Sequence, residues 1–210
     1  MKAWRRYLQY KKNRSELILT LILLIATLIL LSGFLIFTEN RDGTRLADPL
    51  LSLFDPYDLT WLIFILIYAS ILIAVFSLIN HPARLVFTIQ LYILMALIRM
   101  IAMYLMPLEP PEKMIILKDP LIENIGTGII LTKDLFFSGH TATLFILFLT
   151  ATNRYLKTFF LLLTVIVAVS VLIQHVHYTI DVVAAIFFTL SCYHLLISVK
   201  KKIKLSEFDR

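Results

Sequence analysis

The sequence is poor in cysteine, glycine and charge. Cys192 is the only cysteine among 210 residues, which rules out an intramolecular disulfide and a Cys-x-x-Cys metal or redox motif. The five glycines form no glycine-rich nucleotide loop, and no internal repeat or low-complexity tract is present. Charged residues make up 16% of the chain and are nearly absent from the centres of its apolar runs, with Arg99 as the exception. An ion or proton pathway needs ionisable residues deep within several spans, so their scarcity argues against one.

Long apolar runs take up most of the chain. The composition is 60% hydrophobic and the mean hydropathy is +0.86, whereas soluble domains are roughly 45–50% apolar. About 20 apolar residues span a bilayer as a helix. We therefore predict an all-α polytopic membrane protein. Its six transmembrane helices are expected at about residues 15–38, 61–79, 83–106, 136–152, 158–174 and 178–199.

The predicted spans divide the chain into three parts. A basic segment, residues 1–14, precedes a six-helix transmembrane catalytic domain over residues 15–199, and a basic tail follows over residues 200–210. The first segment has no acidic residue, and its aromatic residues are interleaved with six Lys and Arg. This pattern is typical of an interfacial segment that lies against an anionic leaflet. Because the segment runs straight into a membrane helix, nucleic-acid binding is not expected.

The distribution of Lys and Arg predicts how the chain is oriented. With six spans, fourteen Lys and Arg lie on the side of the two termini and five lie on the other side. The positive-inside rule then places both termini in the cytoplasm. His140 and His177 begin the fourth and sixth spans, which run in the same direction, so both belong to the extracytoplasmic face. Arg99 lies about 10 Å from the end of the third span at the same face.

The residues at these two span starts can support acid–base and nucleophilic chemistry. His177 and Asp181 are four residues apart, so on a helix they share one face. A carboxylate beside an imidazole orients the ring as a base or a nucleophile. His140 lies on another segment and is free to act as a general acid toward a leaving oxygen.

The start of the predicted fourth helix can hold an anion. Ser138 and Gly139 precede the free N–H groups of a helix N-terminus, which carries partial positive charge. Arg99 adds a cation that can grip phosphate through two hydrogen bonds. With the two histidines, these parts describe phosphoryl transfer through a phosphohistidine intermediate to water or another alcohol, with no metal or other cofactor required.

Each feature also has an ordinary structural explanation. A His-x-x-x-Asp pair alone is more often a pair on a helix surface, and Arg99 alone can pair with an acidic residue such as Glu109 or Glu123. The convergence of three separate segments on one membrane face favours the functional interpretation.

Two stretches resemble motifs of a known family. Residues 133–141, Lys-Asp-Leu-Phe-Phe-Ser-Gly-His-Thr, resemble an Asp-x-x-x-Ser-Gly-His-Thr motif. Residues 175–183, His-Val-His-Tyr-Thr-Ile-Asp-Val-Val, resemble a His-x-His-Tyr-Thr-x-Asp-Val-Val motif. Both are similar to motifs of the sphingomyelin synthase-like branch of the type 2 phosphatidic acid phosphatase (PAP2) and lipid phosphotransferase superfamily. The resemblance is specific over residues 133–194, is looser near Arg99, and implies a PAP2-like helical core.

The resemblance implies a role for each matched residue. His177 would take the phosphoryl head group as nucleophile, Asp181 would orient it, and His140 would protonate the leaving alcohol. Asp134 matches an acidic residue that supports the site, and Glu123 is the glutamate that we expect to complete it from the preceding loop.

The lipid itself stays open at this stage. A choline-type pocket often has aromatic walls, and Phe136, Phe137 and Tyr178 can supply them. The threonines that follow the family's motif arginine are Ala102 and Met106 here. These departures leave the head group and the acceptor lipid undecided.

We expect an integral membrane lipid phosphotransferase or phosphatase that acts on the outer face of the membrane. We expect this membrane to be a bacterial inner membrane. The leading hypothesis is sphingomyelin synthase-like transfer from a phospholipid or lipid phosphate to an acceptor such as diacylglycerol or ceramide. Hydrolysis to water, as in a PAP2-type phosphatase, is an alternative because it shares the same intermediate. A non-enzymatic lipid-binding or lipid-moving protein is a third hypothesis. It predicts loss of at least one of His140, His177 and Asp181, and all three are present.

Overall fold

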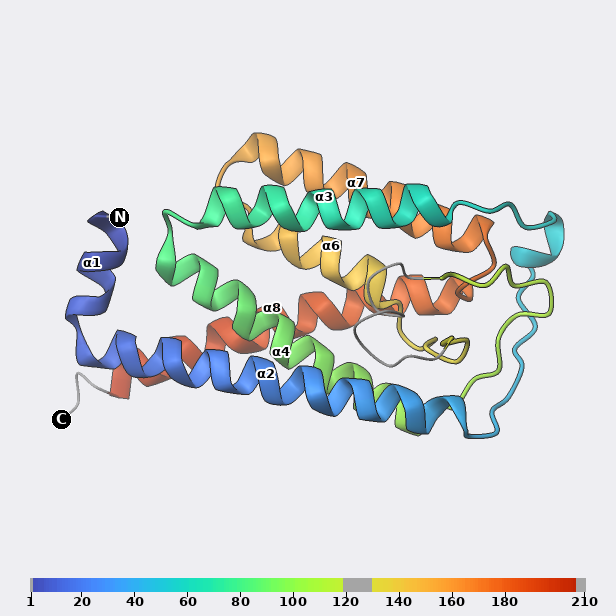
Figure 1. Ribbon diagram of the computed structural model, residues 1–210, viewed down its shortest axis with the longest axis horizontal. Helices are drawn as coiled ribbons and strands as arrows, with labels where there is room; N and C mark the ends of the chain where they lie inside the picture. Colours follow the sequence, from blue (N-terminus) through green and yellow to red (C-terminus); the bar gives the residue numbers. More distant parts are fainter. Residues whose placement is uncertain (1, 119–129, 207–210) are drawn as a thin grey trace.

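The computed structural model describes residues 2–118 and 130–206, and the described chain is helical with irregular loops (Figure 1). The helices are α1 (Lys2–Gln9), α2 (Lys11–Glu39), α3 (Thr60–Leu78), α4 (Pro82–Leu105), α6 (Gly139–Thr150), α7 (Arg154–Ile173) and α8 (Thr179–Ser206), with a short 3-10 helix at Leu51–Leu53. Within the described ranges no strand forms, and one isolated bridge joins Thr44 to Leu108. The predicted all-α fold is therefore confirmed.

Five of the six predicted spans correspond to helices that are long and apolar enough to cross a membrane. These helices are α2, α3, α4, α7 and the part of α8 up to Lys202. The predicted fourth span, residues 136–152, is represented by α6, which has only 12 residues. At 1.5 Å per residue α6 is about 18 Å long, whereas the hydrocarbon core of a bilayer is about 30 Å thick. Five of the six predicted full-length spans are thus confirmed, and the fourth is shorter than predicted.

Local contacts explain why α6 is short. Ser138 caps its beginning, because the Ser138 side chain accepts a hydrogen bond from the backbone N–H of Thr141. At the other end, the side chain of Asn153 caps α7 by accepting from the N–H of Leu156 at 2.9 Å. Asn and Ser favour such capping positions over helix interiors. The residues on either side of α6 are therefore drawn out of the helix that hydropathy alone predicts.

Successive helices run in opposite directions, as Figure 1 shows. The helices α2, α4 and α7 run one way, and α3, α6 and α8 run back. The starts of α6 and α8 therefore lie at the same end of the bundle, together with the loops that follow α2 and α4. We refer to this end as the site end. Helix α1 and the C-terminal part of α8 lie at the opposite end.

Helix α6 lies in the middle of the bundle and packs against α3, α4, α7 and α8. On one side it forms a buried cluster with α3 and α7 that includes Ile63, Leu144 and Val167. On the other side it forms a cluster with α4 and α8 that includes Leu91 and Ile146. Burial of this kind is the main source of stability in a packed core. It holds α6, and the residues at its start, in a defined position.

Helix α2 is the least embedded of the long helices. It packs mainly on α4, and 11% of its most apolar window is buried inside the protein. Such a large exposed apolar surface marks a membrane-facing element. Near the end opposite the site, Gln90 of α4 donates to Thr20 at 2.9 Å, and Lys200 of α8 donates to Glu16 at 2.7 Å. These bonds fasten one end of α2 to the bundle.

Both basic ends of the chain are more helical than the predicted boundaries imply. Helix α2 begins at Lys11, so part of the predicted basic segment 1–14 belongs to it, and α8 extends to Ser206 within the predicted tail. The short helix α1 is anchored by Trp4, whose indole N–H donates to the carbonyl of Ile79 at 2.6 Å. Long Lys and Arg side chains can continue a helix past the membrane because their charged heads reach water.

Candidate active site

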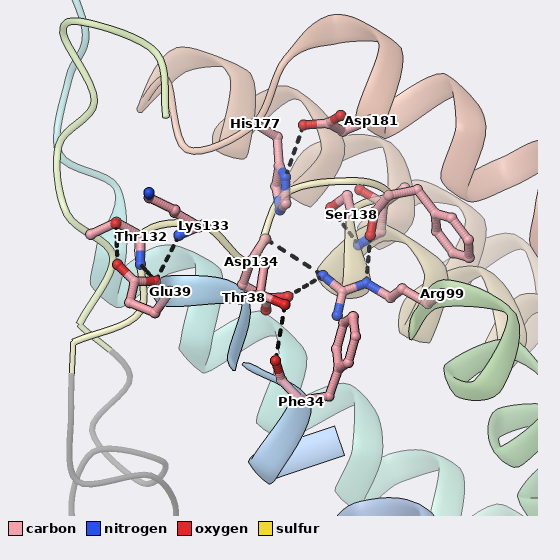
Figure 2. A network of polar contacts seen from close by, with 12 residues as sticks. Phe34, Thr38, Glu39, Arg99, Thr132, Lys133, Asp134, Ser138, His177 and Asp181 are labelled. Carbon is pink, nitrogen blue, oxygen red and sulfur yellow. Dashed lines mark hydrogen bonds and ion pairs between the residues drawn. The ribbon is translucent and has the colours of Figure 1, made fainter. Parts of the chain in front are cut away.

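Arg99 on α4 is buried beneath the start of α6 (Figure 2). Its Nε donates to the carbonyl of Phe137 at 2.5 Å, and its Nη2 pairs with Oδ1 of Asp134 at 2.6 Å. A buried guanidinium needs such partners, because an unpaired charge away from water is very unfavourable. Among the described residues, Asp134 is therefore the carboxylate that balances the charge of Arg99.

Of the two acidic partners considered for Arg99 from sequence, Glu109 has another partner. Glu109 pairs with Nζ of Lys133 at 2.7 Å. This hydrogen bond is the main reason why the pKa of Glu109 lies below its usual value. Glu123, which we expected to complete the site, lies outside the described residues.

Gly139, the first residue of α6, lies directly against the Arg99 side chain. A Cβ atom at this position would be 3.2 Å from Cζ of Arg99 and 3.4 Å from its Nη1. These distances are tighter than ordinary van der Waals contacts. Glycine at residue 139 therefore lets the backbone of the α6 N-terminus approach the guanidinium closely.

This contact predicts opposite effects for two glycine substitutions. Gly33→Ala adds a methyl group to α2 where nothing lies within 4 Å, so it is expected to stabilise the helix by about 0.5–1 kcal/mol. Gly139→Ala is expected to destabilise the protein by about 1 kcal/mol or more through overpacking, and to displace the guanidinium. Thermal unfolding of both variants in detergent measures the difference. Equal shifts would show that Arg99 does not need glycine at residue 139.

His177 and Asp181 form a fully buried pair at the start of α8. Nδ1 of His177 lies 3.4 Å from Oδ2 of Asp181, and the same oxygen accepts a hydrogen bond from the backbone N–H of Tyr178 at 2.9 Å. Both side chains are 0% exposed. The pair is thus not a surface pair on a helix, which was the ordinary alternative.

Two polar atoms of this pair lack a partner in the part of the chain that the structure describes. They are Nε2 of His177 and Oδ1 of Asp181. Buried polar atoms in folded proteins are nearly always hydrogen-bonded, so exceptions often mark functional sites. Since Nδ1 of His177 faces a carboxylate, Nδ1 carries the proton and Nε2 presents its lone pair.

His140 faces His177 across a short gap. The two ring centroids are 5.9 Å apart and the ring planes make an angle of 63°. His140 belongs to the first turn of α6 and is half-buried. Its ring also lies against Phe64 of α3, with centroids 6.1 Å apart. The fold therefore brings together the two histidines that the sequence places 37 residues apart.

A cavity of about 430 Å³ reaches His140 from between the helices. Its long apolar part is lined by side chains from α2, α3, α4 and α6, among them Leu31 and Phe64. Its polar end is formed by Arg99, Asp134, Gly139 and His140. The shape suits a molecule with an apolar tail and an anionic head, because both ends then find matching surroundings.

Ser138 connects the start of α6 to the start of α8. Its backbone N–H donates to the carbonyl of Asp181 at 3.1 Å, while its side chain caps α6. The expected anion cradle at this position therefore consists of the helix N-terminus, and the Ser138 hydroxyl is used in forming it.

The three aromatic residues proposed as head-group walls, Phe136, Phe137 and Tyr178, do not line this cavity. The Tyr178 hydroxyl donates to the carbonyl of Glu109 at 2.9 Å and accepts from the N–H of Leu46 at 3.3 Å. Tyr178 lines a different cavity, of about 540 Å³, at the outer surface of the site end. Phe137 is fully buried and stacks on Phe188 of α8 with centroids 5.1 Å apart. Phe64, which no sequence motif indicates, lines the cavity and lies against the His140 ring.

Glu39, the last residue of α2, was also missed by the sequence analysis. Its Oε2 accepts from the backbone N–H groups of Thr132 and Lys133 at 2.8 and 2.9 Å, and its Oε1 accepts from the Thr132 hydroxyl (Figure 2). A carboxylate at the C-terminus of a helix is unfavourable, because the helix dipole is negative there. The hydrogen bonds to Thr132 and Lys133 are therefore what hold the Glu39 side chain in place. Glu39 thereby holds the segment that leads into Asp134. No local signal reveals it, because its partners are 93 and 94 residues away.

The described residues contain no group of three or more His, Cys, Asp or Glu side chains arranged to hold a metal ion.

Comparison with known proteins found a similarity at the level of a superfamily. The family model described as PAP2 superfamily C-terminal matches residues 133–198. This stretch contains α6, α7 and the larger part of α8, and with them both histidines and Asp134. Comparison with curated proteins and with solved structures gave no match. The match supports membership of the PAP2 superfamily, and together with five span-length helices it fits a membrane lipid phosphatase or phosphotransferase.

Proposed function

We propose that this protein moves a phosphate-linked head group from a membrane lipid through a phosphohistidine intermediate on His177. One observation carries the proposal. The buried His177–Asp181 pair faces His140 at 5.9 Å, beside a cavity whose polar end contains a buried arginine. Nucleophile, orienting carboxylate, general acid and phosphate-binding cation are thus available within one site.

The first step breaks the lipid ester. Nε2 of His177 attacks phosphorus, and the bond between phosphorus and the lipid oxygen breaks. The leaving oxygen takes a proton from His140, so that a neutral lipid alcohol departs and the phosphoryl group stays on His177. Asp181 stabilises the positive charge that develops on the His177 ring.

The second step transfers the group to an acceptor. His140, now neutral, takes the proton of an acceptor hydroxyl while its oxygen attacks phosphorus. The bond between phosphorus and Nε2 of His177 breaks, which regenerates the free enzyme. A lipid alcohol as acceptor gives a new phospholipid, and water gives hydrolysis.

The distance between the histidines suits a phosphorus atom held between them. Reacting atoms approach to roughly 3–3.5 Å before attack, and a general acid lies about 2.6–3.2 Å from the oxygen that it protonates. Because the P–O bond that breaks lies between these two contacts, the two nitrogens must be further apart than either contact alone, and the ring centroids are 5.9 Å apart. We expect the half-buried His140 ring to turn outward to admit the phosphoryl group.

Positive potential near the gap supports binding of the phosphoryl oxygens. Phe137 and Asp134 engage Nε and Nη2 of Arg99, and Nη1 lies on the side of Gly139. The N-terminus of α6 adds partial positive charge at the same place. Charge on phosphoryl oxygens in the transition state is stabilised most by such preorganised groups.

The apolar cavity favours a lipid over a soluble phosphate ester. An acyl chain that enters between α2, α3, α4 and α6 would bury apolar surface, and its head group would reach Arg99 and His140. We propose sphingomyelin synthase-like transfer to a lipid alcohol such as diacylglycerol or ceramide. Hydrolysis to water is kept as the second candidate because it requires the same intermediate. The excess of Lys and Arg at the opposite end of the bundle supports a site on the extracytoplasmic side. The bacterial inner membrane is the location that we propose.

The proposal is tested with purified protein in liposomes. A panel of labelled phospholipids and lipid phosphates is offered with and without diacylglycerol or ceramide. We expect a new phospholipid that appears only when an acceptor is present. Release of phosphate or of a phosphorylated head group regardless of acceptor would instead establish hydrolysis. Absence of turnover on every donor in the panel would contradict both and favour a lipid-binding protein.

A further inference from the structure

The first turn of α8 is capped by a residue from a distant loop. Asp48 lies in the loop after α2, 131 residues from Thr179, the first residue of α8. Its Oδ2 accepts from the backbone N–H of Thr179 at 2.6 Å, and its Oδ1 accepts from the Thr179 hydroxyl at 3.1 Å. A side-chain oxygen that accepts a free N–H at a helix start is a helix cap, normally supplied by a neighbouring residue.

The Asp48 carboxylate is itself held in place. Its Oδ1 also accepts from the N–H groups of Leu50 and Leu51 at 3.0 and 3.4 Å. Burial favours the neutral form of Asp48, but the hydrogen bonds from Thr179 and from these two residues outweigh it, so the pKa of Asp48 lies below its usual value. The charged cap is therefore complete above the ordinary pKa of 3.8 and is lost only as the pH falls through the lower value of the folded state.

Asp181 is a second carboxylate at the start of α8 that can cap its free N–H groups. An acidic residue at the third position of a helix usually turns back to bind free N–H groups at the helix start. Asp181 occupies this position, and its Oδ2 already accepts from Tyr178 while lying 3.4 Å from His177. Its second oxygen has no partner among the described residues. If Thr179 lacked an acceptor, Asp181 could rotate toward it and away from the imidazole.

We propose that Asp48 is a positioning residue: by capping Thr179, it keeps the Asp181 carboxylate on His177. Asp48 touches neither histidine, so it acts through Asp181. The importance of this role for turnover rests on the proposed function of His177. The positioning itself is a property of the structure that can be measured without any substrate.

The matched control is Asp58, which caps another helix in the same way. Oδ1 of Asp58 accepts from the N–H of Thr60, the first residue of α3, at 2.9 Å. Asp58→Ala therefore removes a helix cap from the same loop without touching α8. Asp48→Asn keeps one acceptor oxygen and serves as a milder second variant should Asp48→Ala fold poorly.

The experiment compares Asp48→Ala, Asp48→Asn and Asp58→Ala with the unaltered protein in nanodiscs. Hydrogen exchange at the start of α8 is expected to accelerate at least about fivefold in Asp48→Ala, equivalent to about 1 kcal/mol for a lost cap. Carbethoxylation of His177 by diethyl pyrocarbonate, relative to the exposed His194, is expected to rise about tenfold as the ring is released. For Asp48→Asn, both values should lie between those of Asp48→Ala and the unaltered protein. Asp58→Ala should change neither value.

Three results would overturn the proposal. Unchanged exchange in Asp48→Ala would mean that the cap is not needed, and faster exchange with unchanged His177 reactivity would mean that the cap does not hold the pair. Once a donor is known, kcat should fall about tenfold with KM unchanged, and a change in KM alone would also exclude the role. If the unaltered protein turns over no donor, the proposed function fails, while exchange and carbethoxylation still decide the role of Asp48.

Discussion

Replacement of His177 by alanine is expected to lower turnover by roughly 10⁴- to 10⁶-fold, as loss of a catalytic nucleophile does in other enzymes. The neighbouring residues cannot take over this role. The Asp181 carboxylate is buried behind the His177 ring, and His140 lies on the opposite side of the gap. No residual route through a covalent intermediate is therefore available to the variant.

The intermediate itself can be captured. Protein mixed briefly with a donor labelled in its phosphate and then denatured in alkali should retain the label, which acid should release, as expected for phosphorus bound to an imidazole nitrogen. His177→Ala should retain none. His194→Ala is the matched control, because His194 is an exposed histidine on α8, the helix that follows His177. Label that persists in His177→Ala, or that maps to another residue, would refute the assignment.

Substitution of His140 by glutamine is expected to have an effect that depends on the leaving group. Loss of a general acid lowers rates by typically 10²–10⁴-fold. That loss should appear in full with a lipid donor, whose alkoxide is a poor leaving group. With a nitrophenyl ester of the same head group, the first turnover should slow less than about tenfold, because nitrophenolate leaves without protonation.

Single-turnover release of nitrophenolate and of lipid alcohol measures this difference directly. His81→Gln is the control, because His81 is exposed and precedes α4 at the end of the bundle opposite the site. Equal losses with both leaving groups would show that His140 only binds or positions the substrate. An effect confined to the second step would make His140 a base for the acceptor alone.

Much of the fold follows from local properties of the chain. Apolar runs of span length are visible in any window of about 20 residues, so the five long helices were predicted within a few residues. The exception is the fourth span, where Ser138 caps the start of α6 and Asn153 caps the start of α7, so that residues on either side of α6 lie outside the helix. Hydropathy does not register a capping contact, which is why α6 has 12 residues and not a full span.

The candidate site was likewise predicted only in part from the sequence. The spacing of His177 and Asp181 predicts that they pair, although His177 lies in the turn before α8 and not on the helix itself, and the two motif-like stretches point to His140 and Asp134. Which carboxylate pairs with Arg99 was undecided from sequence, and Asp134 takes that place because the start of α6 packs over α4. Tyr178, grouped with the site by its neighbours in sequence, turns instead toward Leu46 and Glu109.

The class of fold, the two stretches that contain His140 and His177, and the pairing of His177 with Asp181 follow from local sequence, since each depends on residues close together in the chain. Tertiary structure alone decided the length of α6, the approach of the two histidine rings and the lining of the cavity. It also decided the contacts of Glu39 and Asp48, whose partners lie about 90 to 130 residues away. Such contacts depend on how whole helices pack, and no local spacing or composition encodes which distant backbone N–H will meet a given carboxylate.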